Sequence, residues 1–428
     1  MRLLRSTFTA GLALSGALAL PGAASAGTIT IDQAAAEYGA GYLGRLIDPT
    51  GYVAALSGPD YVNTANAVLA LVAAGVGEEQ AAEATAYLLS HVDEAVIDEN
   101  GDDKPGALAV LIMVAHARGE DASALVTRLL ATKQTTGADA GLFGEQYSAY
   151  DGTYRQALSL LALAAVGQTD ADAVAWLKGE QCADGGWMGN NPDPSAACPA
   201  FDFNSFIGED ANGTALAAQA LAALGETPAH DPLDFLRDAQ NDDGGFGFVP
   251  GFDSDANSTA LAVQALIALG EDLGDWAGAD GTPTAYLRSL QLGNPPAKTA
   301  GAFAFQPGTG GALTANVFAT VQVVPALAGV PYPIPPNELS DDLPLLPAQV
   351  PATPTPSPTF VPEPSQVPTP VASPTRIVDP APVPTLVATG GLGEKPWDAT
   401  GQVVFGLGLI GYGVLALGGA KLLARKQG

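Results

Sequence analysis

Residues 236–271, LRDAQNDDGGFGFVPGFDSDANSTALAVQALIALGE, decide the fold. They predict a short amphipathic helix that ends near Gln240, a glycine-rich turn, and a second helix that is apolar on nearly every side. An earlier copy begins at Leu177 with LKGEQCADGGWMGN and resumes at Asp210 with DANGTALAAQALAALGE. Because both copies carry the pattern DANxTALAxQALxALGE, we expect stacked helical pairs that bury their apolar faces against neighbouring copies.

Six copies of this helical pair can be traced between about residues 31 and 330. In the turn, glycines permit positive φ values, and Trp187 or Phe246 stands where a large ring can fill the gap between outer helices. A second helix that is apolar all round must be buried all round. The sequence therefore predicts an all-α fold over residues 27–330, an (α/α)6 toroid of six helical hairpins. We expect the ring to close, because an open array would leave its terminal apolar faces in water.

The composition is acidic, with 45 Asp and Glu against 17 Lys and Arg and a net charge of −28. The electrostatic field of such a negative charge repels nucleic acid and disfavours polyanionic substrates. Residues 1–26 have a basic start, an apolar run and small residues ending at Ala26, which predicts a secretory signal. Export places Cys182 and Cys198, the only cysteines, in an oxidising compartment, so we expect a disulfide between them. Free thiols or a metal-binding pair remain the alternative.

The C-terminal part changes in composition. Residues 331–402 are rich in Pro, Thr and Ser, which predicts a disordered, extended stalk. Residues 403–423 are apolar and long enough to span a bilayer, and the basic tail, residues 424–428, is expected in the cytoplasm. The motif with Leu386, Thr389 and Gly390 resembles a sortase sorting signal, although Val387 replaces its usual proline. Membrane anchoring and sortase attachment to a cell wall both stay open.

The Q-x-x-D-G-G-F/W-G repeats at residues 181–189 and 240–247, with the T-A-L-A-x-Q-A-L helix that follows, resemble the squalene cyclase and protein prenyltransferase repeat. The resemblance covers about residues 31–330. It implies an α/α toroid, a fold that also occurs in cobalamin carriers of the intrinsic-factor type, and it implies little about activity.

The catalytic sets of that family are incomplete here. In prenyltransferases an Asp, a Cys two residues on and a distant His hold zinc. Here Asp151 matches the Asp, but Thr153 stands at the Cys position and Ser258 at the His position. The acid motif D-x-D-D of the cyclases is also incomplete in residues 253–256, DSDA. We therefore expect no catalytic set of this family, no metal site and no cofactor.

The longest turn, residues 187–210, offers a candidate binding site. If the turns before the inner helices lie at one end of the ring, its aromatic residues can form a lip around the central cavity, while local packing of a large loop is the alternative. These residues are Trp187, Phe201, Phe203 and Phe206. Position alone adds further residues to this end of the ring. They are Tyr61, Tyr154, Asn212, Phe248, Phe252 and Asn257.

These features predict an exported toroid held at the cell surface by a C-terminal membrane helix. Its expected function is ligand binding or adhesion, with a small apolar molecule, a surface polymer or a protein as the partner. The alternative is an extracellular enzyme on the same scaffold, either a carboxylate-based glycosidase or lyase or a terpene cyclase or prenyltransferase.

Overall fold

The computed structural model describes residues 31–47, 50–145, 152–189, 198–202 and 207–348. The expected secretory signal with Ala26, the sorting motif with Leu386, Thr389 and Gly390, and the expected membrane span at residues 403–423 lie outside these ranges. Within these ranges, none of the helices has the length and apolar character that crossing a bilayer requires.

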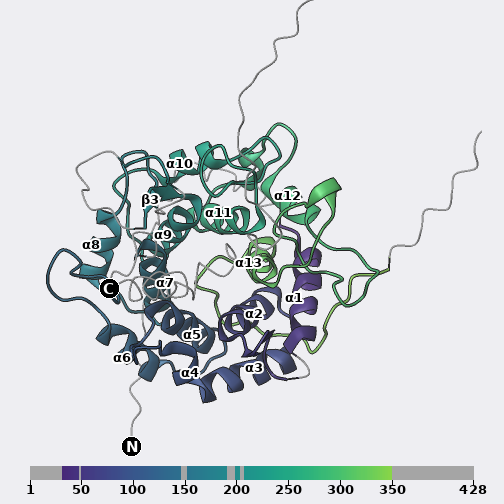
Figure 1. Cartoon of the computed structure of the whole chain (residues 1–428), viewed down its shortest axis with the longest axis horizontal. Helices are drawn as coiled ribbons and strands as arrows, with labels where there is room; N and C mark the ends of the chain where they lie inside the picture. The colour runs from purple at the N-terminus through teal and green to yellow at the C-terminus, as the bar shows by residue number, and fades with distance from the viewer. Residues whose placement is uncertain (1–30, 48–49, 146–151, 190–197, 203–206, 349–428) are drawn as a thin grey trace, which may run out of the picture.

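Six helices that are buried around most of their circumference form an inner ring (Figure 1). They are α2 (Tyr61–Ala74), α5 (Pro105–Ala117), α7 (Gly152–Ala165), α9 (Ala211–Ala223), α11 (Ala256–Leu269) and α13 (Val317–Ala328). Each packs against the next one in the chain, and α13 packs against α2. The predicted closed toroid is therefore confirmed for the described residues.

The outer ring consists of helices that pack on the outside of the inner ring (Figure 1). They are α1 (Gln33–Ile47), α3 (Glu78–Ser90), α6 (Ser123–Ala131), α8 (Ala171–Gly179), α10 (Pro232–Ala239) and α12 (Pro283–Ser289). In α10, for example, Phe235 and Leu236 are buried while charged residues face outward, as expected of an amphipathic helix.

Small elements lie in the connections between the helices. They are α4 (Val92–Val96), η1 (Leu273–Trp276), η2 (Thr309–Gly311) and the strands β1 (Ala54–Ala55), β2 (Gly58–Pro59), β3 (Trp187–Met188) and β4 (Glu209–Asp210). The strands form two antiparallel pairs, β1 with β2 and β3 with β4.

The aromatic residue of the turn is fixed by the inner helix that follows it. In the fourth, fifth and sixth copies, its backbone N–H donates to a threonine hydroxyl near the start of that helix. The pairs are Trp187–Thr214, Phe246–Thr259 and Phe303–Thr320, each at 2.9 Å. In the third copy Gln156 replaces the threonine, and its Oε1 accepts from the N–H of Phe143 at 2.9 Å. All four rings are fully buried, so they form the core between the two rings of helices.

A glycine of the turn fixes the distance to the next copy. Gly244 has a φ of +83°, and a Cβ there would lie 2.5 Å from the carbonyl oxygen of Gly281. Gly301 in the last copy has a φ of +90°, and its Cβ would lie 2.3 Å from the carbonyl oxygen of Tyr38 in the first outer helix. The junction that closes the ring therefore uses the same close backbone contact as an internal junction.

Residues 330–348, here called the strap, extend the folded part beyond its predicted end. The composition assigned residues 331–402 to a disordered stalk, yet the strap pairs with the start of α3. The N–H of Glu78 donates to the carbonyl oxygen of Ser340 at 3.1 Å, and the N–H of Gly77 donates to that of Asp342 at 3.1 Å. A Cβ at Gly41 of α1 would lie 1.9 Å from the carbonyl oxygen of Pro344, so the strap also packs closely on the first helix.

Candidate functional site

The space inside the inner ring, here called the lumen, is bridged by side chains. Tyr154 of α7 and Gln322 of α13 project from opposite sides of the ring, and their side chains lie close to each other. Asn257 of α11 joins them, because its Nδ2 donates to Gln322 Oε1 at 2.8 Å. Tyr332 of the strap enters the same region, where it is 6% exposed and donates its N–H to Gln219 Oε1 at 3.2 Å. The strap and the inner helices thus fill the lumen at this level with their own groups.

Buried carboxyl groups lie at the end of the ring where the inner helices begin, here called the mouth. Asp210 caps α9 and accepts from the N–H of Gly213 at 2.8 Å, and Asp255 caps α11 and accepts from the N–H of Ser258 at 2.8 Å. Burial raises the pKa of Asp210 to about 7 and that of Asp255 to about 6. Asp253, the first acid of the incomplete cyclase motif, is exposed. Both buried carboxyl groups therefore act as helix caps in this structure.

The predicted lip residues lie at different depths. Trp187 is fully buried, and its Nε1 donates to the carbonyl oxygen of Leu177 at 2.8 Å, so its ring belongs to the core. Phe201 packs edge-on against Phe248, with ring centroids 5.2 Å apart. Phe203 and Phe206 lie outside the described residues.

The remaining residues predicted for the mouth also lie in different parts of the structure. Tyr154 lies in the lumen, while Phe252 is 45% exposed at the surface. Asn212 and Asn257 are 2% and 4% exposed, and the Oδ1 atom of each is buried with no hydrogen-bond partner. The carbonyl oxygen of Phe248 accepts from the N–H of Ala211 at 2.8 Å, which covers the start of α9 with the turn of the next copy. Among the described residues, Phe201 contacts Phe248, and Tyr154 and Asn257 both lie beside Gln322, whereas Trp187 is in the core and Phe252 is at the surface.

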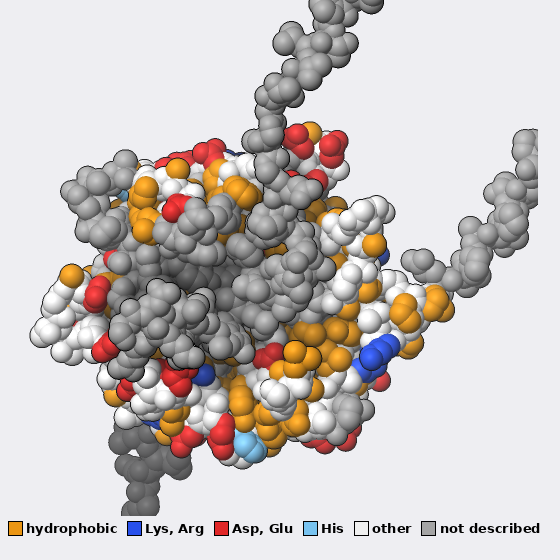
Figure 2. All heavy atoms as spheres, viewed as in Figure 1, with side chains coloured by type: hydrophobic (Ala, Val, Ile, Leu, Met, Phe, Trp, Pro, Cys, Tyr) orange, Lys and Arg blue, Asp and Glu red, His pale blue; other side chains and the backbone are white. Residues whose placement is uncertain are grey.

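An aromatic cluster lies beside the mouth where α2 begins and α3 ends. The ring of Tyr87 lies 4.8 Å from Tyr52, 6.2 Å from Tyr61 and 4.2 Å from His91, measured between centroids. All four side chains are partly exposed, and Leu56 at the tip of the β1–β2 hairpin is fully exposed. Figure 2 shows hydrophobic side chains and a histidine on this face over the region of α3 and α4. Only Tyr61 of this cluster was predicted from the sequence, because Tyr52 precedes the β1–β2 hairpin and Tyr87 and His91 come from the end of the neighbouring outer helix.

The turn of the fourth copy contains sulfur and carboxyl groups. Cys182 and Cys198 form the predicted disulfide. Glu209 lies next to them, with a carboxylate oxygen and the two Sγ atoms all within 4.8 Å of one another. Its pKa is raised to about 8, first by burial and then by a hydrogen bond to Asp184 and the nearby charges of Asp184 and Asp210. No local sequence pattern indicates this cluster, since Glu209 stands 11 or more residues from both cysteines.

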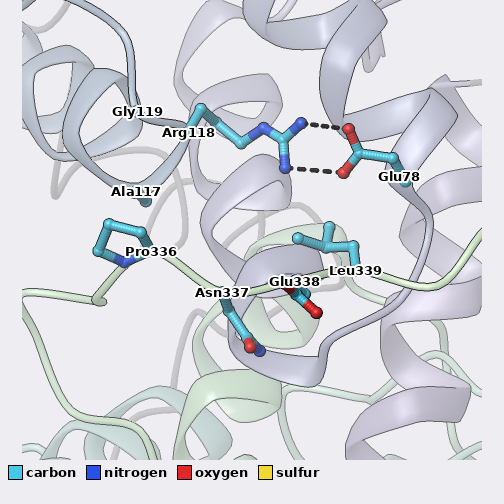
Figure 3. Close-up of a pocket in the computed structure, with 8 residues that line it drawn as sticks. All are labelled: Glu78, Ala117, Arg118, Gly119, Pro336, Asn337, Glu338 and Leu339. Carbon is cyan, nitrogen blue, oxygen red and sulfur yellow. Dashed lines mark hydrogen bonds and ion pairs between the residues drawn. The ribbon is translucent and has the colours of Figure 1, made fainter.

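A separate open cleft of about 470 Å³ lies between the strap and the adjoining ends of α3 and α5 (Figure 3). Arg118 and Glu78 form a two-pronged ion pair in it, with N–O distances of 2.9 and 2.7 Å. The strap contributes residues 336–339 to its wall. Since both terminal nitrogens of Arg118 already pair with Glu78, the cleft offers little unpaired charge to an anionic ligand.

Comparison with known proteins finds structures that share the helical architecture in part. No family model and no curated protein sequence matches the chain. An unsaturated glucuronyl hydrolase from Bacillus sp. GL1, responsible for the degradation of glycosaminoglycan, is 17% identical over 68% of this chain and 94% of its own, with a TM-score of 0.45. A structure described as UGL with dGlcA-Glc-Rha-Glc gives 16% identity, 69% and 95% coverage and a TM-score of 0.46.

A protein prenyltransferase is also among the similar structures. The protein geranylgeranyltransferase-I of Candida albicans, complexed with GGPP, is 11% identical over 68% of this chain and 90% of its own, with a TM-score of 0.40. Similarity at these identities and TM-scores implies nothing about the activity of this chain.

Proposed function

We propose that this chain is a binding or adhesion module displayed at the cell surface, and that its ligand contacts the outside of the toroid. The burial of Tyr332 inside the ring, where its N–H bonds to Gln219, carries this proposal. Tyr332 and the paired amide side chains of Asn257 and Gln322 occupy the middle of the ring, which favours a ligand site on the outside. The expected signal, stalk and membrane segment would hold such a surface away from the cell.

The aromatic cluster with Leu56 is the surface that best suits a polymer. Tyrosine rings offer apolar faces together with polar hydroxyl groups, a combination typical of surfaces that bind partly polar ligands. The neighbouring carboxylates of Asp93 and Glu94 are exposed and can accept hydrogen bonds from hydroxyl groups. The net charge of −28 opposes polyanions, so a neutral polysaccharide is the proposed ligand class.

Retention on neutral polysaccharide particles tests this proposal. The full-length chain in mild detergent is mixed with insoluble glucan or mannan, and the retained fraction is measured. Leu56→Ser is expected to lower retention severalfold without changing thermal stability, because Leu56 is fully exposed. Leu345→Ser is the matched control, since Leu345 is an exposed leucine on the strap. Equal retention of the two variants, or no retention of the native chain, would overturn the proposal.

The raised pKa of Glu209 suggests a second candidate function, that of an enzyme. A carboxyl group with a pKa of about 8 holds its proton at neutral pH, as a general acid must. A carboxylate-based glycosidase or lyase would release new reducing ends or unsaturated sugars from a polysaccharide. Glu209→Gln is expected to abolish that release, and the absence of any release by the native chain would remove this candidate.

A further inference from the structure

The fourth and fifth copies place different chemistry on the same framework. By alignment of their turns, Cys182 corresponds to Asn241, Asp184 to Asp243, and Glu209 to Ser254. In the fifth copy the three side chains form one hydrogen-bonded chain. Its bonds run from Asn241 Nδ2 to Ser254 Oγ at 2.9 Å and from Ser254 Oγ to Asp243 Oδ1 at 2.7 Å.

In the fourth copy the same three positions hold a cysteine and two carboxyl groups. Glu209 takes the place of the serine and keeps the contact with Asp184. Cys198 adds a second sulfur, which has no counterpart in the fifth copy and comes from the longer turn. The Oε2 atom of Glu209 is buried with no hydrogen-bond partner, so one acceptor of this cluster is unused.

We propose that this cluster becomes a site for one zinc-like divalent cation when the disulfide is reduced, a role separate from the proposed binding function. Cys182, Cys198 and Glu209 supply three ligand atoms, and a water molecule would take the fourth position. Two thiolates and a carboxylate are ligands that Zn²⁺ accepts in tetrahedral geometry. Because the sulfur and oxygen atoms already lie within 4.8 Å of one another, small side-chain rotations bring them to a common centre.

The redox step needs a dithiol as the reductant. Its thiolate attacks Sγ of Cys198, which is partly exposed, while Cys182 is buried. The disulfide gains two electrons and two protons and becomes two thiols, and the dithiol becomes a disulfide. The cation then displaces the thiol protons and the proton of Glu209, which pass to water.

The backbone holds the cluster in place independently of the disulfide. Strands β3 and β4 pair Trp187 with Asp210 and Met188 with Glu209, so Glu209 stays opposite the turn that carries Cys182. The N–H of Cys182 donates to the carbonyl oxygen of Gly186 at 2.8 Å, which fixes the turn itself. We therefore expect the reduced chain to keep its fold and its ligand geometry.

Titration of the reduced full-length chain with Cd²⁺ alone tests the site. The chain is reduced with dithiothreitol and freed of reductant without oxygen, and the ultraviolet sulfur-to-cadmium absorption is followed. One Cd²⁺ per chain is expected, with no such absorption for the oxidised chain or for Cys182→Ser with Cys198→Ser. Glu209→Gln should weaken binding by about tenfold or more because it removes a ligand, whereas Ser254→Ala in the fifth copy should not.

Three results would overturn the proposal. They are the absence of the absorption in the reduced chain, equal affinity of the native chain and Glu209→Gln, and loss of helical circular dichroism on reduction. Zinc competing for the bound Cd²⁺ with the same one-to-one stoichiometry would support it further.

Discussion

The side-chain nitrogen of Gln291, just after the last outer helix, donates to the carbonyl oxygen of Ala35 in the first outer helix at 2.9 Å. Within the array, Gln240 makes the equivalent bond to the carbonyl oxygen of Trp276 at 2.6 Å. The glutamine of the repeated turn thus joins the fourth, fifth and sixth copies to the copy that follows, and after the sixth copy comes the first. Ring closure is built from the same bonds as the repeat.

Gln291→Ala should weaken this closure. The substitution leaves two carbonyl oxygens, those of Ala35 and Gly301, without this partner, so we expect a loss of about 1–3 kcal/mol in unfolding free energy. Urea denaturation measures this loss. Gln240→Ala is the control with a similar cost, but only Gln291→Ala should speed amide exchange in α1. Unchanged exchange there would contradict closure through this bond.

Gly301→Ala should destabilise the chain much more than Gly251→Ala. Both glycines have positive φ values, +90° and +83°, so both variants carry backbone strain of about 1 kcal/mol. A Cβ at position 251 meets nothing within 4 Å, whereas one at position 301 lies 2.3 Å from the carbonyl oxygen of Tyr38. We expect a total loss of about 3 kcal/mol or more for Gly301→Ala in urea denaturation. Equal losses would show that the first and last copies are not in contact.

Tyr332→Ala should leave a cavity in the lumen. Because the side chain is buried among the inner helices, we expect a loss of about 3–5 kcal/mol in unfolding free energy. Leu345→Ala, at an exposed position of the same strap, should cost less than about 0.5 kcal/mol. Similar small effects of both variants would mean that the strap does not enter the ring in solution.

Glu209 should make the folded chain less stable as the pH rises. Its pKa is raised from 4.5 to about 8, so between these values the folded chain keeps a proton that the unfolded chain releases. The stabilisation is complete below pH 4.5 and is lost as the pH approaches 8. Glu209→Gln removes this titration, so its unfolding free energy should fall less over that range. Parallel pH profiles would contradict the raised pKa.

Asp210 and Asp255 have raised pKa values too and titrate within the same range. These two groups titrate both in the native chain and in Glu209→Gln. The difference between the pH profiles of the two proteins therefore reports the titration of Glu209. Urea midpoints measured in steps from pH 4 to pH 9 supply the comparison.

The repeat pattern predicted the architecture because each copy carries its own signals. The apolar second helices, the glycine turns and the capping residues such as Asp255 act over short distances and can be recognised in one sequence. The disulfide followed from the sequence too, since Cys182 and Cys198 are the only cysteines of the chain.

The filled lumen could not be predicted in this way. Tyr332 lies in a proline-rich segment whose composition is typical of a stalk, and only tertiary contacts show that it enters the ring. The contact between Tyr154 and Gln322 joins helices that are far apart in the chain, so no local pattern reveals it. Glu209 likewise gains its role only where strand pairing brings it to the turn of the fourth copy.

Hydrogen exchange of the backbone amide of Tyr332 tests the filled lumen most directly. Its N–H donates to Gln219 Oε1 inside the ring, at a position 6% exposed to solvent. In the full-length chain this amide should therefore exchange as slowly as the amides in the middle of α9, through global unfolding. Exchange within seconds, while those amides of α9 stay protected, would show an open, water-filled lumen and contradict the account.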